Sequence, residues 1–186
     1  EKYIEQAINS VLSQDYPSIE LIVIDDGSTD NSPQIIKELH DKHQNFTYLR
    51  QKNSGLIATL KSGLNRARGE FFCQLASDDF LASNSISKRA EILCTNPDCV
   101  AVFTDAYGVD GETVTQQRVT RDKLKRMYAS YDPIAHILNG APPIFATGLL
   151  RTSALQAIDA FDSLSLLRRS RYANPAFDPG FLSISR

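Results

Sequence analysis

The sequence predicts an α/β fold, with a mainly parallel central sheet covered by helices on both faces. Short apolar runs rich in β-branched residues alternate with longer segments in which apolar residues recur at helical spacing, and this alternation favours a parallel sheet. Two of the apolar runs end in paired aspartates, Asp25-Asp26 and Asp78-Asp79. Because ligands of open α/β sheets bind beyond the carboxyl ends of the strands, we expect a ligand site at this edge.

The composition is typical of one globular domain and argues against several function classes. The chain has 186 residues, of which 42% are hydrophobic and 23% charged, and its formal net charge is −2. One domain with a sizeable core is therefore expected, and nucleic-acid binding is disfavoured. No apolar run approaches the roughly 20 residues of a membrane span. Cys73, Cys94 and Cys99 lack CxxC spacing, which favours a reduced, cytoplasmic setting over a disulfide framework.

The first hundred residues predict helices and strands in strict alternation. Helical spacing of apolar residues predicts helices over 1–13, 33–43 and 56–68, and a fourth that begins after the capping residues 83–85. Strands are predicted at 21–24, 46–51, 71–75 and 100–103. Pro33 suits the first position of its helix, and Gly69 stands where a helix end would take a left-handed residue.

The second half of the chain is less periodic. Asp110-Gly111 is a hairpin signal between two short strand-like runs. Residues 120–131 are charged and could form a surface helix or a loop, and short helices are predicted at 133–139 and 152–158. The tail from 162 to 186 shows little periodicity. We therefore interpret the chain as one domain, with a ligand-binding half at 1–103 and a second half at 104–186.

The paired aspartates suggest a metal site, although a simpler explanation exists. Carboxylates at strand ends suit Mg²⁺ or Mn²⁺, and such an ion commonly bridges one or two carboxylates to substrate phosphates. Aspartates also occur widely in turns and helix caps, which is the more common explanation for a single pair. Two pairs at one sheet edge, with Asn53-Ser54-Gly55 ending the strand between them, favour a site.

Other kinds of site find little support in the residues. His40, His43 and His136 flank no Ser or Cys nucleophile. Neither the P-loop spacing nor a GxGxxG motif is present. The helical pattern alone makes Lys61 a solvated surface lysine.

Several stretches together resemble family 2 glycosyltransferases of the GT-A fold, a Rossmann-like three-layer sandwich. The resemblance covers about residues 1–102 in one order, and Ala160-Phe161-Asp162 also fits the family pattern. The stretches that carry it are Tyr3-Ile4, Ser10 to Gln14, Ile22 to Asp30, Asn53-Ser54-Gly55, Gly63-Leu64, Ala67 to Glu70 and Leu75 to Asp79.

The resemblance implies an inverting, metal-dependent transfer of a sugar from a nucleotide-sugar donor, a UDP-sugar by preference, to an acceptor hydroxyl. Asp25 and Asp26 would hold the base and ribose, with Ser28 nearby. Asp78 would bind Mn²⁺ or Mg²⁺ with Asp79 beside it. The remaining donor-site residues would be Asn53, Gly55 and Ser77. The acceptor would be a saccharide or a lipid-linked group in polysaccharide or glycoconjugate biosynthesis. The protein could then also associate peripherally with the inner face of the membrane.

The sequence departs from the family pattern in four places. The first strand and its Pro-x-x-Asn turn are missing, so we expect the chain to be a piece of a longer protein. Ala76 replaces the first acidic residue of the Leu-Asp-x-Asp-Asp signature, and Thr59-Leu60-Lys61 replaces Ala-Arg-Asn, which makes Lys61 a substitute donor contact. No Glu-Asp-Trp segment follows Phe161, so the general base is expected to be absent, with Asp162 as the one candidate.

Two rival functions stay open at this point. A catalytically inactive sugar-nucleotide-binding or scaffold domain of the same fold is favoured by Ala76 and by the missing base segment. A nucleotidyltransferase would share the sheet and the metal, but would need a Gly-rich loop with Lys or Arg after its first strand.

Overall fold

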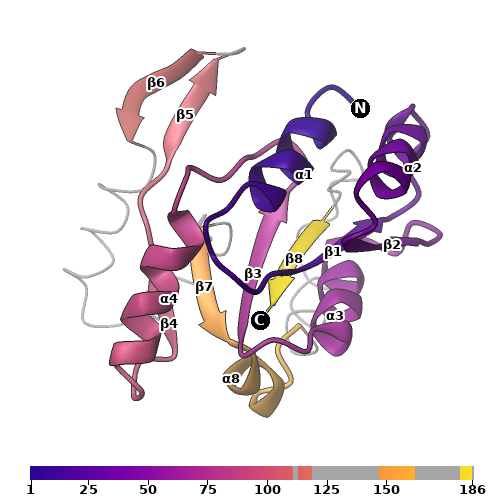
Figure 1. Ribbon diagram of the computed structural model, residues 1–186. Helices are drawn as coiled ribbons and strands as arrows, with labels where there is room; N and C mark the ends of the chain where they lie inside the picture. Colours follow the sequence, from indigo (N-terminus) through magenta and orange to yellow (C-terminus); the bar gives the residue numbers. More distant parts are fainter. Residues whose placement is uncertain (111–112, 119–146, 162–180, 186) are drawn as a thin grey trace, which may run out of the picture.

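A mixed six-stranded sheet forms the centre of the computed structural model, which describes residues 1–110, 113–118, 147–161 and 181–185 (Figure 1). The strand order is β2-β1-β8-β3-β7-β4. The strands are β1 (Glu20–Asp25), β2 (Phe46–Arg50), β3 (Phe71–Ala76), β4 (Ala101–Phe103), β7 (Gly148–Arg151) and β8 (Phe181–Ser185). The helices are α1 (Ile4–Leu12), α2 (Ser32–His43), α3 (Leu56–Arg66), α4 (Ser85–Thr95) and α8 (Thr152–Ala157). The predicted α/β fold is confirmed.

The strand directions bring the carboxyl ends of β1, β2 and β3 to one edge of the sheet. β1 pairs with β2 in parallel, and β8 pairs antiparallel with both β1 and β3. Because two antiparallel steps restore the original direction, β1 and β3 run the same way. β7 is antiparallel to β3 and to β4. The expected common edge of the two aspartate pairs therefore exists, although β7 and β8, which the sequence did not predict, run in the opposite direction.

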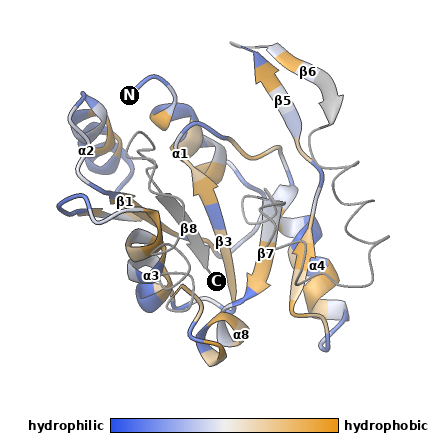
Figure 2. Cartoon of the chain, turned by 180° about the vertical axis from the view of Figure 1, so that it is seen from behind, coloured by the Kyte–Doolittle hydropathy of each residue, from blue (hydrophilic) through white to orange (hydrophobic). Residues whose placement is uncertain are grey.

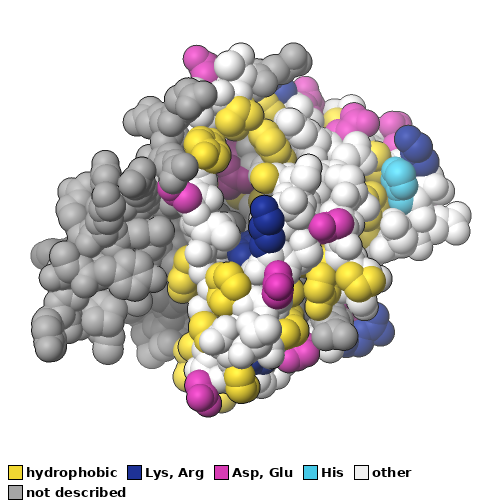
Figure 3. Space-filling model, turned by 60° about the vertical axis from the view of Figure 1, so that its left-hand side comes forward, with side chains coloured by type: hydrophobic (Ala, Val, Ile, Leu, Met, Phe, Trp, Pro, Cys, Tyr) yellow, Lys and Arg dark blue, Asp and Glu magenta, His cyan; other side chains and the backbone are white. Residues whose placement is uncertain are grey.

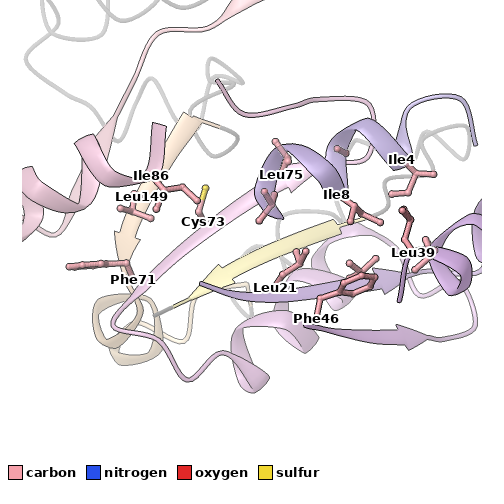
Figure 4. Packing of buried hydrophobic residues seen from close by; sticks show 14 of the residues in the cluster. Ile4, Ile8, Leu21, Leu39, Phe46, Phe71, Cys73, Leu75, Ile86 and Leu149 are labelled. Atoms are coloured by element: carbon pink, nitrogen blue, oxygen red, sulfur yellow. The ribbon is translucent and has the colours of Figure 1, made fainter. Parts of the chain in front are cut away.

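Two hydrophobic clusters lie on opposite faces of the sheet, which gives the expected three layers. The larger cluster joins α1, α2 and α4 to one face, and its packing is shown in Figure 4. The smaller cluster joins α3 and α8 to the other face. Phe72 belongs to the smaller cluster, whereas its neighbours Phe71 and Cys73 belong to the larger one, because successive strand residues point to opposite faces.

The burial of β1 shows why the sheet is covered on both sides. Its residues Leu21 to Ile24 are all 1–2% exposed, so side chains of both faces are shielded from water. The apolar residues of β3 and β7 and the hydrophilic outer sides of α2 and α3 are visible in Figure 2. α1 buries Ile4, Ala7, Ile8 and Val11, the stripe that the helical spacing predicted.

The expected left-handed glycine at the end of α3 is wrong. α3 ends at Arg66, its C-cap Ala67 is extended, and Gly69 does not have a positive φ. The chain continues from there toward β3, and Glu20 at the start of β1 accepts hydrogen bonds from the Arg68 N–H at 3.0 Å and from its Nε at 2.8 Å. The Glu20 carboxylate thus fixes Arg68 beside the start of β1, just after α3 ends.

The remaining predictions have mixed outcomes. The hairpin exists as a separate two-stranded sheet of β5 (Tyr107–Asp110) and β6 (Thr113–Arg118), and the helix expected at 152–158 is α8. The segments expected at 120–131 and 133–139 lie outside the described residues. Among the described helices, none combines the length and apolarity that crossing a membrane requires. On the face shown in Figure 3, acidic side chains lie among basic and hydrophobic ones.

Candidate functional site

Asp25 ends β1 and holds the following loop in place. Its carboxylate is buried and accepts a hydrogen bond from the Ser28 N–H at 2.7 Å. It also pairs with Arg50 Nε at 3.1 Å and accepts a 3.3 Å hydrogen bond from the Tyr48 hydroxyl. Burial, and then the Asp25 charge, raise the pKa of Tyr48 above its ordinary value. Since Tyr48 and Arg50 belong to β2, the Asp25 carboxylate connects two strands and a loop.

Asp26 is equally buried, and its carboxylate organises the loop after β2. It accepts hydrogen bonds from Gln51 Nε2 at 2.8 Å, from the Ser54 N–H at 2.9 Å, from the Ser54 hydroxyl at 3.0 Å and from the Gly55 N–H at 2.8 Å. Burial alone would raise the pKa of Asp26, but these four hydrogen bonds together lower it below its usual value. Asp26 is thus an ionised anchor for residues 53–55.

Gly27 allows the two loops to touch. Its φ is +88°, and a Cβ at this position would lie 2.8 Å from the backbone nitrogen of Asn53. Only glycine adopts this conformation without strain and leaves room for the neighbouring backbone. Gly55, with φ +83°, turns the chain into α3 directly after the residues that Asp26 holds.

A cavity of about 190 Å³ joins the ends of β1 and β3. Its polar wall includes Asp25 and Ser28 from the first strand end and Ser77 from the third. Ile4, Val23, Ile24 and Ile36 supply apolar lining, and Glu1, Asp30 and Ser32 complete it. The cavity is smaller than the 300–1,000 Å³ typical of ligand pockets, so it suits one part of a larger ligand.

Negative charge lies at the wall of this cavity. The Asp30 carboxylate lines it, and its Oδ1 accepts a hydrogen bond from the Ser32 N–H at 3.0 Å. Together with Asp25, Asp30 gives this end of the cavity two carboxylates.

Asp78 and Asp79 lie on the exposed loop after β3. The Asp79 N–H donates to the Ala76 carbonyl at 3.2 Å, which turns the chain at the strand end. Partial desolvation raises the pKa of Asp79, and the charge of Asp78 raises it further. Within the described residues, no cluster of three or more His, Cys, Asp or Glu could hold a metal ion. Two adjacent exposed carboxylates nevertheless fit Mg²⁺ or Mn²⁺, because such ions commonly take only one or two protein carboxylates beside water and phosphate.

The structure brings some predicted site residues together and separates others. Asp25, Ser28 and Ser77 share the cavity, while Gly55 donates its N–H to Asp26 and the backbone of Asn53 lies close to Gly27. Lys61 is half-buried on α3 and does not line the cavity. Asp162, the candidate base, lies outside the described residues.

Three residues near the site were missed by sequence reasoning: Tyr48, Arg50 and Gln51. Tyr48 and Arg50 are two apart on β2 and so point to one face, which is a signal that the sequence contains. Their partner could not be found in this way, because the register that pairs Arg50 with Asp25 joins distant segments. Gln51 directly follows β2, and its amide reaches Asp26, Ser54 and Thr59.

Comparisons with known proteins agree on one family. Residues 1–170 match the family described as Glycosyl transferase family 2. The chain is 40% identical over 97 residues to an uncharacterized glycosyltransferase of Haemophilus influenzae, covering 52% of this chain and 39% of that protein. It is 31% identical over 169 residues to an uncharacterized glycosyltransferase of Rickettsia prowazekii, covering 86% and 49%. It is 30% identical over 111 residues to the chondroitin synthase of Escherichia coli, covering 60% and 16%. The chain therefore spans less than half the length of each of these relatives.

Proposed function

Because the chain belongs to glycosyl transferase family 2, we propose that it binds a nucleoside-diphosphate sugar, a UDP-sugar by preference, and transfers the sugar to an acceptor hydroxyl with inversion. The observation that supports this most directly is the cavity that joins the end of β1 to the end of β3. A donor with a nucleoside at one end and a diphosphate at the other needs two neighbouring subsites of different chemistry, and the two strand ends offer them.

The nucleoside end of the donor would lie at the β1 end. Asp25 and Ser28 line the cavity there, and Asp25 is fixed by its contacts with Tyr48 and Arg50. Asp26 would act indirectly, because its carboxylate already accepts four hydrogen bonds from residues 51–55. In this proposal Asp26 holds the loop of Asn53 and Gly55, while Asp25, whose carboxylate is fixed by Ser28, Tyr48 and Arg50, forms the wall at the nucleoside end of the cavity.

The diphosphate end would lie at Asp78 and Asp79, with Ser77 between the subsites. These two carboxylates would hold Mn²⁺ or Mg²⁺, which when bound supplies Lewis-acid neutralisation of the charge on the leaving diphosphate. In the displacement, the acceptor oxygen bonds to the anomeric carbon as the bond from that carbon to the phosphate oxygen breaks. The acceptor proton passes to a carboxylate base, for which Asp162 is the candidate within this chain.

We propose a saccharide as the acceptor and the cytoplasm as the location. One relative is named for the synthesis of chondroitin, which supports a saccharide acceptor, and a lipid-linked acceptor in glycoconjugate assembly is the alternative. Cys73, Cys94 and Cys99 are free thiols, which supports a reducing, cytoplasmic setting. Peripheral association with the inner membrane face would bring the enzyme to a lipid-linked acceptor.

A domain that binds the sugar nucleotide without transferring the sugar is the second candidate. Ala76 is its support, because this last residue of β3 is apolar where the family signature carries an acid. Such a domain would bind UDP with metal and would neither transfer nor hydrolyse a donor.

Titration of the full protein with UDP, with and without Mn²⁺, tests the proposal. We expect Mn²⁺ to tighten UDP binding and Asp78→Ala to abolish that gain. Asp98→Ala is the matched control, because Asp98 is an exposed aspartate beyond α4. Undiminished metal-dependent binding in Asp78→Ala would overturn the metal assignment. Release of UDP from a UDP-sugar would then separate the transferase from the non-catalytic domain, and an anomerically retained product would contradict inversion.

A further inference from the structure

The loop that bears Asp78 and Asp79 is fastened to α1 by two polar side chains. α1 lies over the carboxyl end of β3 in both views of the fold (Figures 1 and 2). Its apolar stripe packs into the core, whereas Ser10 in its last turn and Gln14 just beyond its end are half-buried beside the loop. These two residues contact main-chain groups about 70 positions further along the chain.

Ser10 accepts a hydrogen bond from the backbone of the loop. Its hydroxyl donates to the Ala7 carbonyl at 2.7 Å, so its single proton is used within the helix. The oxygen then accepts the Leu81 N–H at 3.0 Å. The position of Leu81 relative to α1 is therefore fixed only two residues after Asp79.

Gln14 fixes the far end of the same loop. Its Nε2 donates to the Ser10 carbonyl and to the Ala82 carbonyl, both at 3.0 Å, and its Oε1 accepts the Ile86 N–H at 3.2 Å. Ile86 lies in the first turn of α4, where backbone N–H groups lack partners within the helix, and the N-cap Asn84 provides no side-chain cap. Gln14 thus caps α4 from outside.

We propose that Ser10 and Gln14 are positioning residues that hold the 77–84 loop so that the carboxylates of Asp78 and Asp79 are preorganised for the metal and the diphosphate. This inference rests on the proposed function. Asp78 and Asp79 are exposed, and in the described chain their carboxylates accept no hydrogen bond, so only the backbone can set their direction. The Leu81, Ala82 and Ile86 contacts supply that backbone support. A site held in place before ligand arrives binds more tightly, because less ordering is left to occur on binding.

A purely structural role for these contacts predicts a different pattern. If Ser10 and Gln14 only joined α1 to α4, their loss would lower the melting temperature and leave the ligand affinity of the folded protein unchanged. If they position the carboxylates, their loss reduces the gain in UDP affinity that Mn²⁺ provides. The ratio of the UDP dissociation constants without and with Mn²⁺ separates the two roles, because it is measured within one folded variant.

The experiment compares this ratio in the full protein and its variants, well below their melting temperatures. For Ser10→Ala and Gln14→Ala we expect the ratio to fall about two- to tenfold, the range of one neutral hydrogen bond. Ser10→Thr keeps the hydroxyl and should retain the ratio. Ser13→Ala is the matched control, because the exposed Ser13 hydroxyl contacts only the Ser10 carbonyl of its own helix, at 3.4 Å.

Amide hydrogen exchange of the metal-free protein provides a second readout. Ser10→Ala should accelerate exchange at Leu81, and Gln14→Ala should accelerate it at Ile86, with little change in β1. If an alanine variant fails to fold, Gln14→Glu replaces it. This variant retains an acceptor for the Ile86 N–H and loses the donor to the Ala82 carbonyl, so it should lower the ratio of the UDP dissociation constants.

The outcomes distinguish this inference from the function on which it rests. If Asp78→Ala leaves the Mn²⁺ effect intact, the metal assignment itself is wrong. If Asp78→Ala abolishes the effect while Ser10→Ala and Gln14→Ala keep the wild-type ratio, the positioning role is overturned and the proposed function stands.

Discussion

The ends of β1 and β3 carry the same dipeptide, Asp-Asp, in opposite physical states. Asp25 and Asp26 are each 1% exposed, and their carboxylates accept hydrogen bonds from the surrounding loops and from β2. Asp78 and Asp79 are exposed and, in the part of the chain that the structure describes, accept none. A buried carboxylate whose oxygens accept hydrogen bonds can hold the walls of a site, whereas an exposed pair has oxygens that are accessible to a ligand.

Replacement of the buried Asp26 should give the largest loss of stability. Asp26→Ala leaves the N–H groups of Ser54 and Gly55 without their acceptor and removes one of the three acceptors of the Gln51 amide, and we expect a loss of about 2–4 kcal/mol. Asp78→Ala should change stability by less than about 0.5 kcal/mol, because the residue is exposed. Urea unfolding of both variants measures the difference, and equal losses would remove the contrast between the two strand ends.

Gly27→Ala should have the next largest effect. The new methyl group would lie 2.8 Å from Asn53 N at a φ of +88°, so the loop around Asn53 must shift. We expect a loss of about 1–3 kcal/mol together with weaker UDP binding in the absence of metal. Gly108→Ala, in β5 and away from the cavity, is the control. A Gly27→Ala protein with wild-type stability and affinity would show that the two loops do not need their close contact.

The contribution of Asp26 should also appear in the pH dependence of the stability. The pKa of Asp26 in the folded protein lies below its ordinary value of 3.8, so its contribution to stability is complete above about 3.8 and is lost as pH falls through the folded value. Asp26→Asn should therefore flatten the acid side of the stability profile measured by thermal unfolding. A profile as steep as that of the wild type would mean that other carboxylates dominate acid unfolding.

Among the substitutions that remove a contact of the buried aspartates, the smallest effect is expected at Tyr48. Tyr48→Phe removes a 3.3 Å hydrogen bond to Asp25, while the Arg50 contact and the Ser28 N–H keep the carboxylate satisfied. A loss of about 0.5–1 kcal/mol is expected in chemical denaturation. Phe46→Leu, at the start of the same strand, is a packing control that leaves the Asp25 contacts in place. A loss above about 2 kcal/mol for Tyr48→Phe would mean that the tyrosine, and not Arg50, is the main partner of Asp25.

The helices and strands that the sequence predicted are those with a regular local pattern of apolar residues. The bounds of α1, α2, β1, β2, β3 and α4 agree with the apolar periodicity to within three residues, because each of these elements buries a regular stripe or run. Pro33 lies in the first turn of α2, one residue after the first position that the sequence predicted for it.

Long-range pairing explains what the sequence could not predict. β7 and β8 are short, and their strand character comes from partners far along the chain, such as β3. The same limit applies to the site. The sequence pointed to Asp25 and Asp26 as donor contacts, but the acceptor role of Asp26 depends on N–H groups 28 and 29 residues away. No local feature of the sequence indicated that the Asp25-Asp26 pair would be buried and the Asp78-Asp79 pair exposed.

The division of labour between the two strand ends is tested most directly by the Mn²⁺ dependence of UDP affinity in Asp26→Asn and Asp78→Ala, each measured where the protein is folded. We expect Asp78→Ala to abolish the Mn²⁺ gain with the metal-free affinity unchanged, and Asp26→Asn to weaken both affinities by the same factor. Loss of the Mn²⁺ gain in Asp26→Asn and its retention in Asp78→Ala would contradict the account.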